Sequence, residues 1–228
     1  DTPNLTQITV MPNNKNFSFL NEKFIVGKSS IDNDNYDVLV FAIRNIKKAI
    51  IPSFIKIIGP FSFETCNELS KVEISNDSEL QKIEKYSFFN SSIESIFIPP
   101  KVTHICEGAF ASCQLRKIEI SSNSELKVIE KEAFCCSCIE SISIPSSVVK
   151  LKKGWCSQTS NLIHISVMPN NKYYSSYNEN KFIIGKSSYK KDIFDVLVFS
   201  VRNIETAIIP SFIEIIGPYA FSGCDELK

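Results

Sequence analysis

Apolar residues recur along this chain in short alternating runs that are separated by turn residues. Runs with the pattern L-x-x-I-x-I begin at Leu5, Leu69, Ile93, Leu115, Ile139 and Leu162. From Leu69 to Leu162, consecutive runs start 24, 22, 24 and 23 residues apart. Alternation with a period of two is typical of a half-buried β-strand, and self-similarity at this spacing is typical of a solenoid of stacked coils. We therefore predict that these runs pair side by side in a parallel sheet, because one coil cannot bury its own apolar face.

A second apolar line follows each strand-like run. Its outline is I-x-x-I-x-x-x-A-F, as in LQKIEKYSF from Leu80, VTHICEGAF from Val102 and LKVIEKEAF from Leu126. This line is predicted to form the wall opposite the sheet, with its last aromatic residue filling the layer between the two walls. We expect these aromatic residues to form an internal stack: Phe63, Phe88, Phe110, Phe134, Trp155 and Phe221.

A longer block of sequence is present twice. The segment PNNKNFSFLNEKFIVGKSS from Pro12 returns in similar form from Pro169, and YDVLVFAIRNI from Tyr36 returns from Phe194. The extra residues contain two strand-like runs, so they predict an added β-hairpin that protrudes from one side of the solenoid. We expect one solenoid over residues 1–228, with longer hairpin-bearing coils at about 12–52 and 169–210 and regular repeats at 53–168 and 211–228.

Both ends of the chain fall inside repeats. The last residues, SGCDELK, stop where Leu227 would open another strand, and neither end shows the polar cap that closes most natural solenoids. These features lead us to expect a fragment of a larger array. Strand edges exposed at such ends would favour self-association.

Charge and hydropathy narrow the choice of partner. The chain carries 25 Lys and Arg against 25 Asp and Glu, a net charge of zero. It therefore has no overall attraction for nucleic acid or an anionic membrane, and we expect no nucleic-acid partner. No apolar run approaches the ~20 residues that a membrane-spanning helix needs, so we expect no direct insertion into a membrane.

Two segments carry a resemblance to a known family. IPPKVTHICEGAFASCQLRKIEI (98–120) and IPSFIEIIGPYAFSGCDEL (209–227) resemble the IP-x-x-V-x-x-I-G-x-x-A-F-x-x-C-x-x-L repeat of the BspA-type leucine-rich repeat family. The resemblance covers nearly the whole chain. It departs from the family at positions where glycine or phenylalanine is usual: Glu84, Cys106, Glu130, Lys152 and Trp155. These departures alter single turns and leave the pattern of the repeat intact.

The resemblance implies both a fold and a role. The fold is a β-rich leucine-rich-repeat solenoid, a parallel β-sheet of stacked coils of about 23 residues with two longer hairpin-bearing coils. Members of the family are similar to surface or secreted proteins of host-associated bacteria and parasitic protists, with roles in adhesion to host cells and matrix and in aggregation between cells. It therefore implies a protein ligand on host cells or matrix and a location at the cell surface or in secretion.

The eight cysteines do not form a recognisable metal signature. Cys66, Cys113 and Cys224 each follow the repeat aromatic by three residues, which fits small residues packed at a tight corner. Neighbouring coils could bring some cysteines within disulfide reach, and the sequence leaves that open. The cluster at 135–138 lacks the second pair of ligands that zinc requires, so we expect no metal and no cofactor.

No set of residues points to catalysis. His104 and His164 are sixty residues apart and occupy outward slots of the repeat, and no nucleophile and base with an orienting third group can be recognised. The GKSS segments at 27–30 and 185–188 lack the upstream glycine of a phosphate-binding loop. We expect no enzymatic activity. Four N-x-S/T sequons, at Asn4, Asn16, Asn76 and Asn90, could carry glycans in a secreted eukaryotic protein.

The outward face of the L-x-x-I-x-I sheet is the predicted binding surface. Phe97 is an aromatic residue where the neighbouring runs carry polar ones; it is either a binding anchor or packed on its neighbours' aliphatic stems. The tyrosines at 173, 174 and 177 mark a second candidate surface on the hairpin. An intracellular scaffold, whose cysteines would stay reduced, is the alternative to an adhesin. The predicted binding residues are Lys71, Glu73, Glu94, Phe97, Arg116, Lys117, Glu119, Glu140 and His164.

Overall fold

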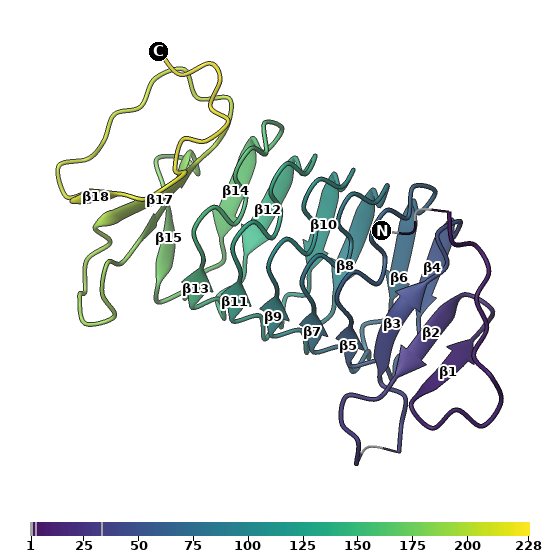
Figure 1. Cartoon of the computed structure of the whole chain (residues 1–228). Helices are drawn as coiled ribbons and strands as arrows, with labels where there is room; N and C mark the ends of the chain where they lie inside the picture. Colours follow the sequence, from purple (N-terminus) through teal and green to yellow (C-terminus); the bar gives the residue numbers. More distant parts are fainter. Residues whose placement is uncertain (1, 3, 33) are drawn as a thin grey trace.

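The computed structural model describes residues 2, 4–32 and 34–228, and it shows a solenoid of stacked coils with two facing walls of β-strands (Figure 1). Each regular coil contributes a four-residue strand to one wall and a two-residue strand to the other. In the described part of the chain, all helix or strand structure is β, and no helix is long and apolar enough to cross a membrane. The predicted β-solenoid with parallel sheets is confirmed.

One wall, here called the long-strand sheet, contains the predicted L-x-x-I-x-I strands. All its neighbouring strands run parallel. From one edge to the other it consists of β14 (His164–Val167), β12 (Ser141–Ile144), β10 (Lys117–Ile120), β8 (Ser95–Ile98), β6 (Lys71–Ile74) and β4 (Lys48–Ile51).

The other wall, the short-strand sheet, is built mainly from the second apolar line. Its order is β1 (Phe17–Leu20), β2 (Phe24–Gly27), β3 (Val38–Ala42), β5 (Ile57–Ile58), β7 (Lys82–Ile83), β9 (His104–Ile105), β11 (Val128–Ile129) and β13 (Lys150–Leu151). A separate four-stranded sheet near the C-terminus contains β15 (Tyr174–Tyr177), β16 (Phe182–Gly185), β17 (Val196–Ser200) and β18 (Ile215–Ile216).

Alternation along each long strand puts its apolar residues into the core. Ile96 and Ile118 are register partners and are both buried, whereas Lys117 and Glu119 are exposed on the outer face. Full burial of an isoleucine side chain contributes about 1.5–3 kcal/mol to stability. Because the same slot recurs in every coil, the inward residues form continuous rows between the walls.

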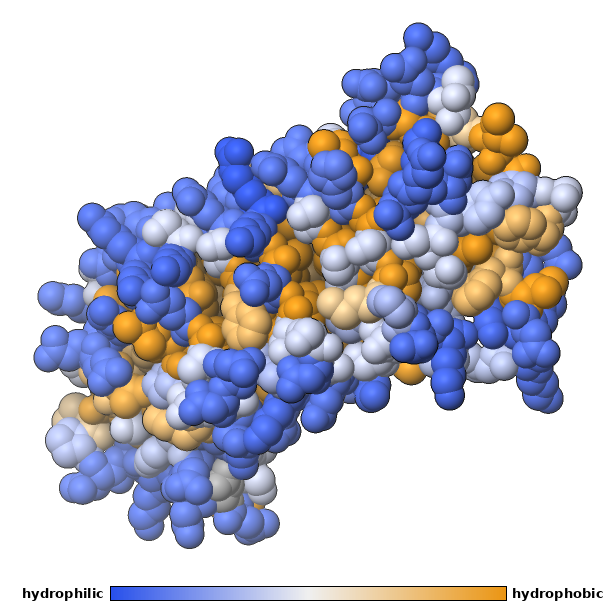
Figure 2. All heavy atoms as spheres, turned by 180° about the vertical axis from the view of Figure 1, so that it is seen from behind, coloured by the Kyte–Doolittle hydropathy of each residue, from blue (hydrophilic) through white to orange (hydrophobic). Residues whose placement is uncertain are grey.

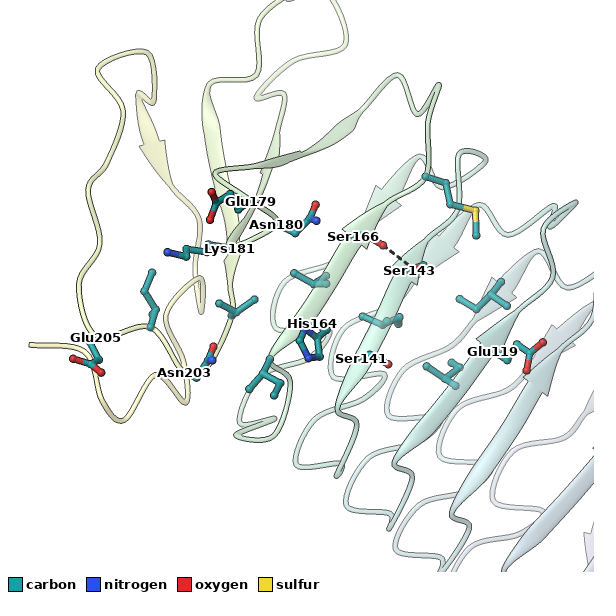
Figure 3. A pocket seen from close by; sticks show the side chains of 18 of the residues that line it. Glu119, Ser141, Ser143, His164, Ser166, Glu179, Asn180, Lys181, Asn203 and Glu205 are labelled. Carbon is teal, nitrogen blue, oxygen red and sulfur yellow. Dashed lines mark hydrogen bonds between the residues drawn. The ribbon is translucent and has the colours of Figure 1, made fainter.

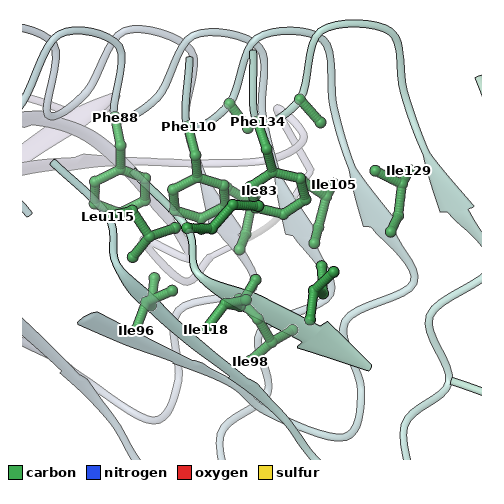
Figure 4. Close-up of a cluster of buried hydrophobic side chains, with 14 of the residues drawn as sticks. Ile83, Phe88, Ile96, Ile98, Ile105, Phe110, Leu115, Ile118, Ile129 and Phe134 are labelled. Atoms are coloured by element: carbon green, nitrogen blue, oxygen red, sulfur yellow. The ribbon is translucent and has the colours of Figure 1, made fainter. Parts of the chain in front are cut away.

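The predicted aromatic stack lies between the two walls (Figure 4). The rings of Phe63, Phe88, Phe110 and Phe134 are fully buried and nearly parallel, with successive centroids 4.8, 5.1 and 5.4 Å apart. Trp155 continues the row edge-on, 6.3 Å from Phe134. Stacks of this geometry add about 0.5–1.5 kcal/mol per pair beyond the burial of area.

The end of the stack differs from the prediction. Phe199 of β17, and not Phe221, contacts the Trp155 ring, at a centroid distance of 5.9 Å. Phe221 is only half-buried and makes no ring contact among the described residues. The reason is that the second long coil supplies its own aromatic from β17 at the layer that Phe221 was expected to fill.

Both long coils contain the predicted hairpins; the second lies in the separate four-stranded sheet, whereas the first is part of a wall. Strands β1, β2 and β3 form an antiparallel meander, and β3 runs parallel to β5, so the meander extends the short-strand sheet instead of protruding from its side. The duplicated PNNK segment starts each meander. Asn14 Oδ1 accepts a hydrogen bond from the backbone N–H of Phe17, and Asn171 Oδ1 accepts one from Tyr174, both at 2.9 Å. Asparagine is favoured in such turns because its side chain can replace a backbone acceptor.

The first L-x-x-I-x-I run was predicted to be a strand, and this prediction is wrong. Residues 5–10 form no strand, and β4 is the edge strand of the long-strand sheet on that side. The backbone N–H of Arg44 donates to the Leu5 carbonyl at 3.0 Å, but residues 6–10 are part of no sheet. Residues 206–209, the second copy of the β4 sequence, likewise form no strand.

Candidate functional site

The structure places all nine predicted binding residues on the outer side of the long-strand sheet. Six of them lie within its strands, and the other three immediately precede β8, β10 and β12. In chain order they are Lys71, Glu73, Glu94, Phe97, Arg116, Lys117, Glu119, Glu140 and His164. The parallel register therefore gathers them on one surface, and their role in binding stays a prediction.

Exposed ion pairs link neighbouring strands on this face. Lys48 and Lys71 both lie 2.9 Å from Glu73, and their hydrogen bonds hold the pKa of the Glu73 carboxyl below its usual range. Arg116 and Glu140 are 3.9 Å apart. Exposed pairs of this kind contribute about 0–1 kcal/mol each. These side chains are thus held loosely and can form ion pairs with a partner at little cost.

Phe97 is half-buried within the face and lies opposite Glu119 of the next strand. A shallow depression of about 240 Å³ surrounds it, bordered by Lys71 and Glu73. Figure 2 shows the molecule from the side opposite to Figure 1, where apolar side chains form a band between hydrophilic margins. An aromatic side chain ringed by charged groups is a common anchor in protein interfaces.

A larger groove, here called the notch, lies where the long-strand sheet ends at β14. It encloses about 860 Å³ between strands β10, β12 and β14 on one side and residues 179–181 and 201–206 on the other. Figure 3 shows His164 and Glu119 on the side of the sheet, with Lys181 and Glu205 on the segments beyond it. Sequence reasoning missed the notch. The feature of the sequence that could have revealed it is the length of the second long coil. This coil separates β14 from residues 206–209, which repeat the β4 sequence and would follow β14 in an unbroken sheet.

A buried arginine fixes the shape of the notch. The backbone N–H of Arg202 donates to the carbonyl oxygen of Leu162 at 3.1 Å, just before β14. The guanidinium donates to the carbonyls of Cys156 and Ala220 at 3.0 and 3.3 Å and lies 4.1 Å from the centre of the Phe199 ring. The chain after Arg202 therefore starts beside β14 and then diverges from it without pairing.

The same arrangement occurs in the first long coil. Arg44 is also buried, its backbone N–H donates to Leu5 at 3.0 Å, and its guanidinium donates to the carbonyl of Ser62 at 2.9 Å. A buried guanidinium is tolerated because backbone carbonyls accept its N–H groups. Sequence analysis did not single out these arginines, although the duplicated RNI motif contains both of them.

The remaining candidates have structural roles. In the GKSS segment, Ser29 donates both its backbone N–H and its hydroxyl to the Asp37 carboxylate, each at 2.9 Å. Ser187 does the same for Asp195, at 2.7 and 2.6 Å, and Lys191 also donates to this carboxylate. These bonds hold the pKa of Asp195 below its usual range, with the bond from Lys191 as the largest cause. The segment closes the loop between two strands.

The cysteines and histidines form no metal centre within the described residues 2, 4–32 and 34–228. Cys66, Cys113 and Cys156 are buried, and burial raises the pKa of the Cys113 thiol to about 12. Cys135 and Cys136 lie at the surface with their sulfur atoms 3.4 Å apart. His104 is in the short-strand sheet and His164 in the long-strand sheet, so the two histidines stand on opposite walls.

The fold and this face define a class of protein: a repeat solenoid with one long, shallow and mostly polar surface. The profile of the family described as BspA type Leucine rich repeat region matches six copies, over residues 14–116, 74–182 and 191–228. Since these matches cover most of the chain, it belongs to the BspA-type leucine-rich repeat family. Comparison with curated protein sequences gives no match.

Solved structures share this fold. The chain resembles the pneumococcal vaccine antigen PcpA with a TM-score of 0.72 and 27% identity, over 80% of this chain and 44% of that one. It resembles a leucine-rich cell surface protein from Faecalibacterium prausnitzii A2-165 with a TM-score of 0.60 and 17% identity, over 96% and 69% of the two chains. A leucine-rich repeat protein from Bacteroides ovatus ATCC 8483 gives 0.57 and 18%, over 97% and 52%. The chain thus spans less than half the length of PcpA.

Proposed function

We propose that this chain is a non-enzymatic binding module of a BspA-like surface protein, which mediates adhesion to host cells or matrix, or aggregation between cells, through protein–protein contacts. The observation that carries the proposal is the outer face of the long-strand sheet, where exposed charges and Phe97 form one surface across neighbouring coils. Similarity to a leucine-rich cell surface protein supports a location at the surface. Repetition along an array would strengthen weak individual contacts by avidity.

Binding to intact epithelial cells and to a panel of immobilised matrix proteins, at low and high salt, tests this proposal. We expect saturable binding that the Phe97→Ala, Arg116→Ala double variant weakens roughly tenfold or more, as loss of an aromatic and an arginine anchor does in other interfaces. The matched control is Phe61→Ala, Lys85→Ala, an aromatic–cation pair outside this sheet. The proposal would be contradicted if both variants lost the same amount of binding affinity, or if the unmodified chain showed no saturable binding.

An intracellular scaffold is the second candidate, and one observation favours it. Cys66, Cys113 and Cys156 pack in the core as small apolar side chains, a role that requires no disulfide and suits a reducing compartment. The mass of the protein isolated from its native source separates the two candidates. Disulfides or attached glycans would support the surface module, whereas eight free thiols would support the scaffold. Self-association through the ends of the solenoid stays a prediction, which the oligomeric state in solution tests.

A further inference from the structure

We propose that the notch binds an extended polypeptide segment that carries lysine or arginine, and that this segment adds a strand to the free edge of β14. The inference rests on the proposed function, because it describes how one part of the protein-binding face takes its partner. It adds a mode of recognition, main-chain pairing at a break in the sheet, to the side-chain contacts of the outer face.

The first argument is the unpaired edge of β14. In a parallel ladder, alternate residues direct their backbone groups to opposite neighbours. His164 and Met168 donate toward β12, so the backbone groups of Ile165 and Val167 point away from β12. The Val167 N–H is taken by the Ser176 hydroxyl, which leaves the N–H and C=O groups of Ile165 directed to the notch. Among the described residues, no strand pairs with this edge of β14, which is the last strand of its sheet. Exposed strand edges of this kind are templates for pairing with another chain.

The second argument is the length of the edge. It is closed at one end by the bond from Arg202 to the Leu162 carbonyl, and at the other by the Ser176 hydroxyl, which accepts from the Val167 N–H at 2.9 Å. Five residue steps separate these points, which corresponds to roughly 16 Å of strand. The notch therefore has room along β14 for a short segment, about four to six residues in extended form.

The third argument is the chemistry of the two sides of the notch. Ile165, Val201 and Ile204 are buried at its base and would meet the inward side chains of an added strand. Glu119, Glu179 and Glu205 line it as exposed carboxylates, against a single lysine, Lys181. Within the described part of the chain these three carboxylates form no ion pair. A segment with apolar residues on one side and a basic residue on the other matches this pattern.

Labelled synthetic heptapeptides provide a direct test by fluorescence anisotropy with the whole chain. The probe is Thr-Val-Lys-Val-Lys-Val-Thr, compared with the same peptide carrying Glu in place of Lys. We expect saturable binding of the lysine peptide, roughly three- to tenfold tighter than the glutamate peptide at low salt, since each surface ion pair contributes up to about fivefold. High salt should reduce the difference in affinity between the two peptides, because salt screens exposed charges. N-methylation of one alternating set of peptide amides should abolish binding, whereas methylation of the other set should leave it.

A pair of variants assigns the binding to the notch. Glu179→Gln, Glu205→Gln, on the segments that face the edge of β14, should remove most of the preference for lysine, whereas the matched control Glu64→Gln, Glu125→Gln, outside the notch, should keep it. The proposal would be overturned if both peptides bound with equal affinity, or if neither methylated set changed the affinity. It would also be overturned if both variants lost the preference for lysine to the same extent. If no peptide binds while the cell and matrix assays still show saturable binding, the notch proposal fails and the wider proposed function stands.

Discussion

Replacing Phe110 by alanine removes the middle ring of the aromatic stack. The ring is fully buried and lies 5.1 Å from Phe88 and 5.4 Å from Phe134, nearly parallel to both. Truncation of a buried phenylalanine costs about 3–5 kcal/mol. Because two ring contacts are lost as well as the buried area, we expect a decrease of about 4 kcal/mol in the free energy of unfolding. Phe110→Leu keeps most of the volume and should lose only about 1–3 kcal/mol, the value of two ring contacts.

Urea unfolding measures this loss. Trp155 is the single tryptophan and sits buried in the same row of rings, so its fluorescence reports directly on the stack, and far-UV circular dichroism provides a second probe. Coincident transitions by the two probes show that the solenoid unfolds as one unit. Phe97→Ala is the control, because Phe97 is half-buried on the outer face. A loss for Phe110→Ala below about 2 kcal/mol, or equal to that of the control, would refute the view that the stack holds the coils together.

Two further predictions concern the second long coil. Asp195→Asn should lower the stability of the protein at neutral pH, because the lowered pKa of the Asp195 carboxylate stabilises the fold above its unfolded pKa. The difference in stability from the wild type should shrink as the pH falls below about 4, where the carboxylate becomes protonated and this stabilisation is lost. Thermal unfolding at several pH values checks this, and a difference that grows at low pH contradicts it. Tyr174→Phe should cost about 1 kcal/mol, since the Tyr174 hydroxyl accepts the Leu151 N–H at 2.8 Å and its loss leaves that partly buried donor without its partner. Urea unfolding of this variant would contradict the reasoning if the loss were negligible.

The regular coils could be predicted from the sequence because a single physical rule governs them. Period-two alternation places Ile96 and Ile118 inward wherever it occurs, and stacking then aligns Phe88 with Phe110 and their neighbours. Both features depend only on residues within one coil and on the coil beside it. The same alternation places the predicted residues within the strands, such as Lys117 and Glu119, on the outer face, and their role in binding stays a prediction.

The long coils could be predicted only in part, because their geometry depends on contacts between distant segments. The hairpin followed from two strand-like runs, but its place in the short-strand sheet depends on the pairing of β3 with β5. The notch depends on Arg202, whose guanidinium reaches the carbonyl of Cys156, forty-six residues earlier in the chain. No local pattern marks a buried arginine as the residue that divides a sheet, although its duplication at Arg44 offered a clue.

The long-strand sheet is interrupted at each long coil, and the distance between the two interruptions is set by the number of strands between them. Between the two breaks the sheet has six strands, so five strand spacings separate its edges, about 24 Å in all. Gain or loss of one regular coil would change this interval by a single step of about 4.8 Å and leave each break intact. The number of regular coils therefore sets the distance between the two long coils, whereas the geometry of each long coil does not depend on that number.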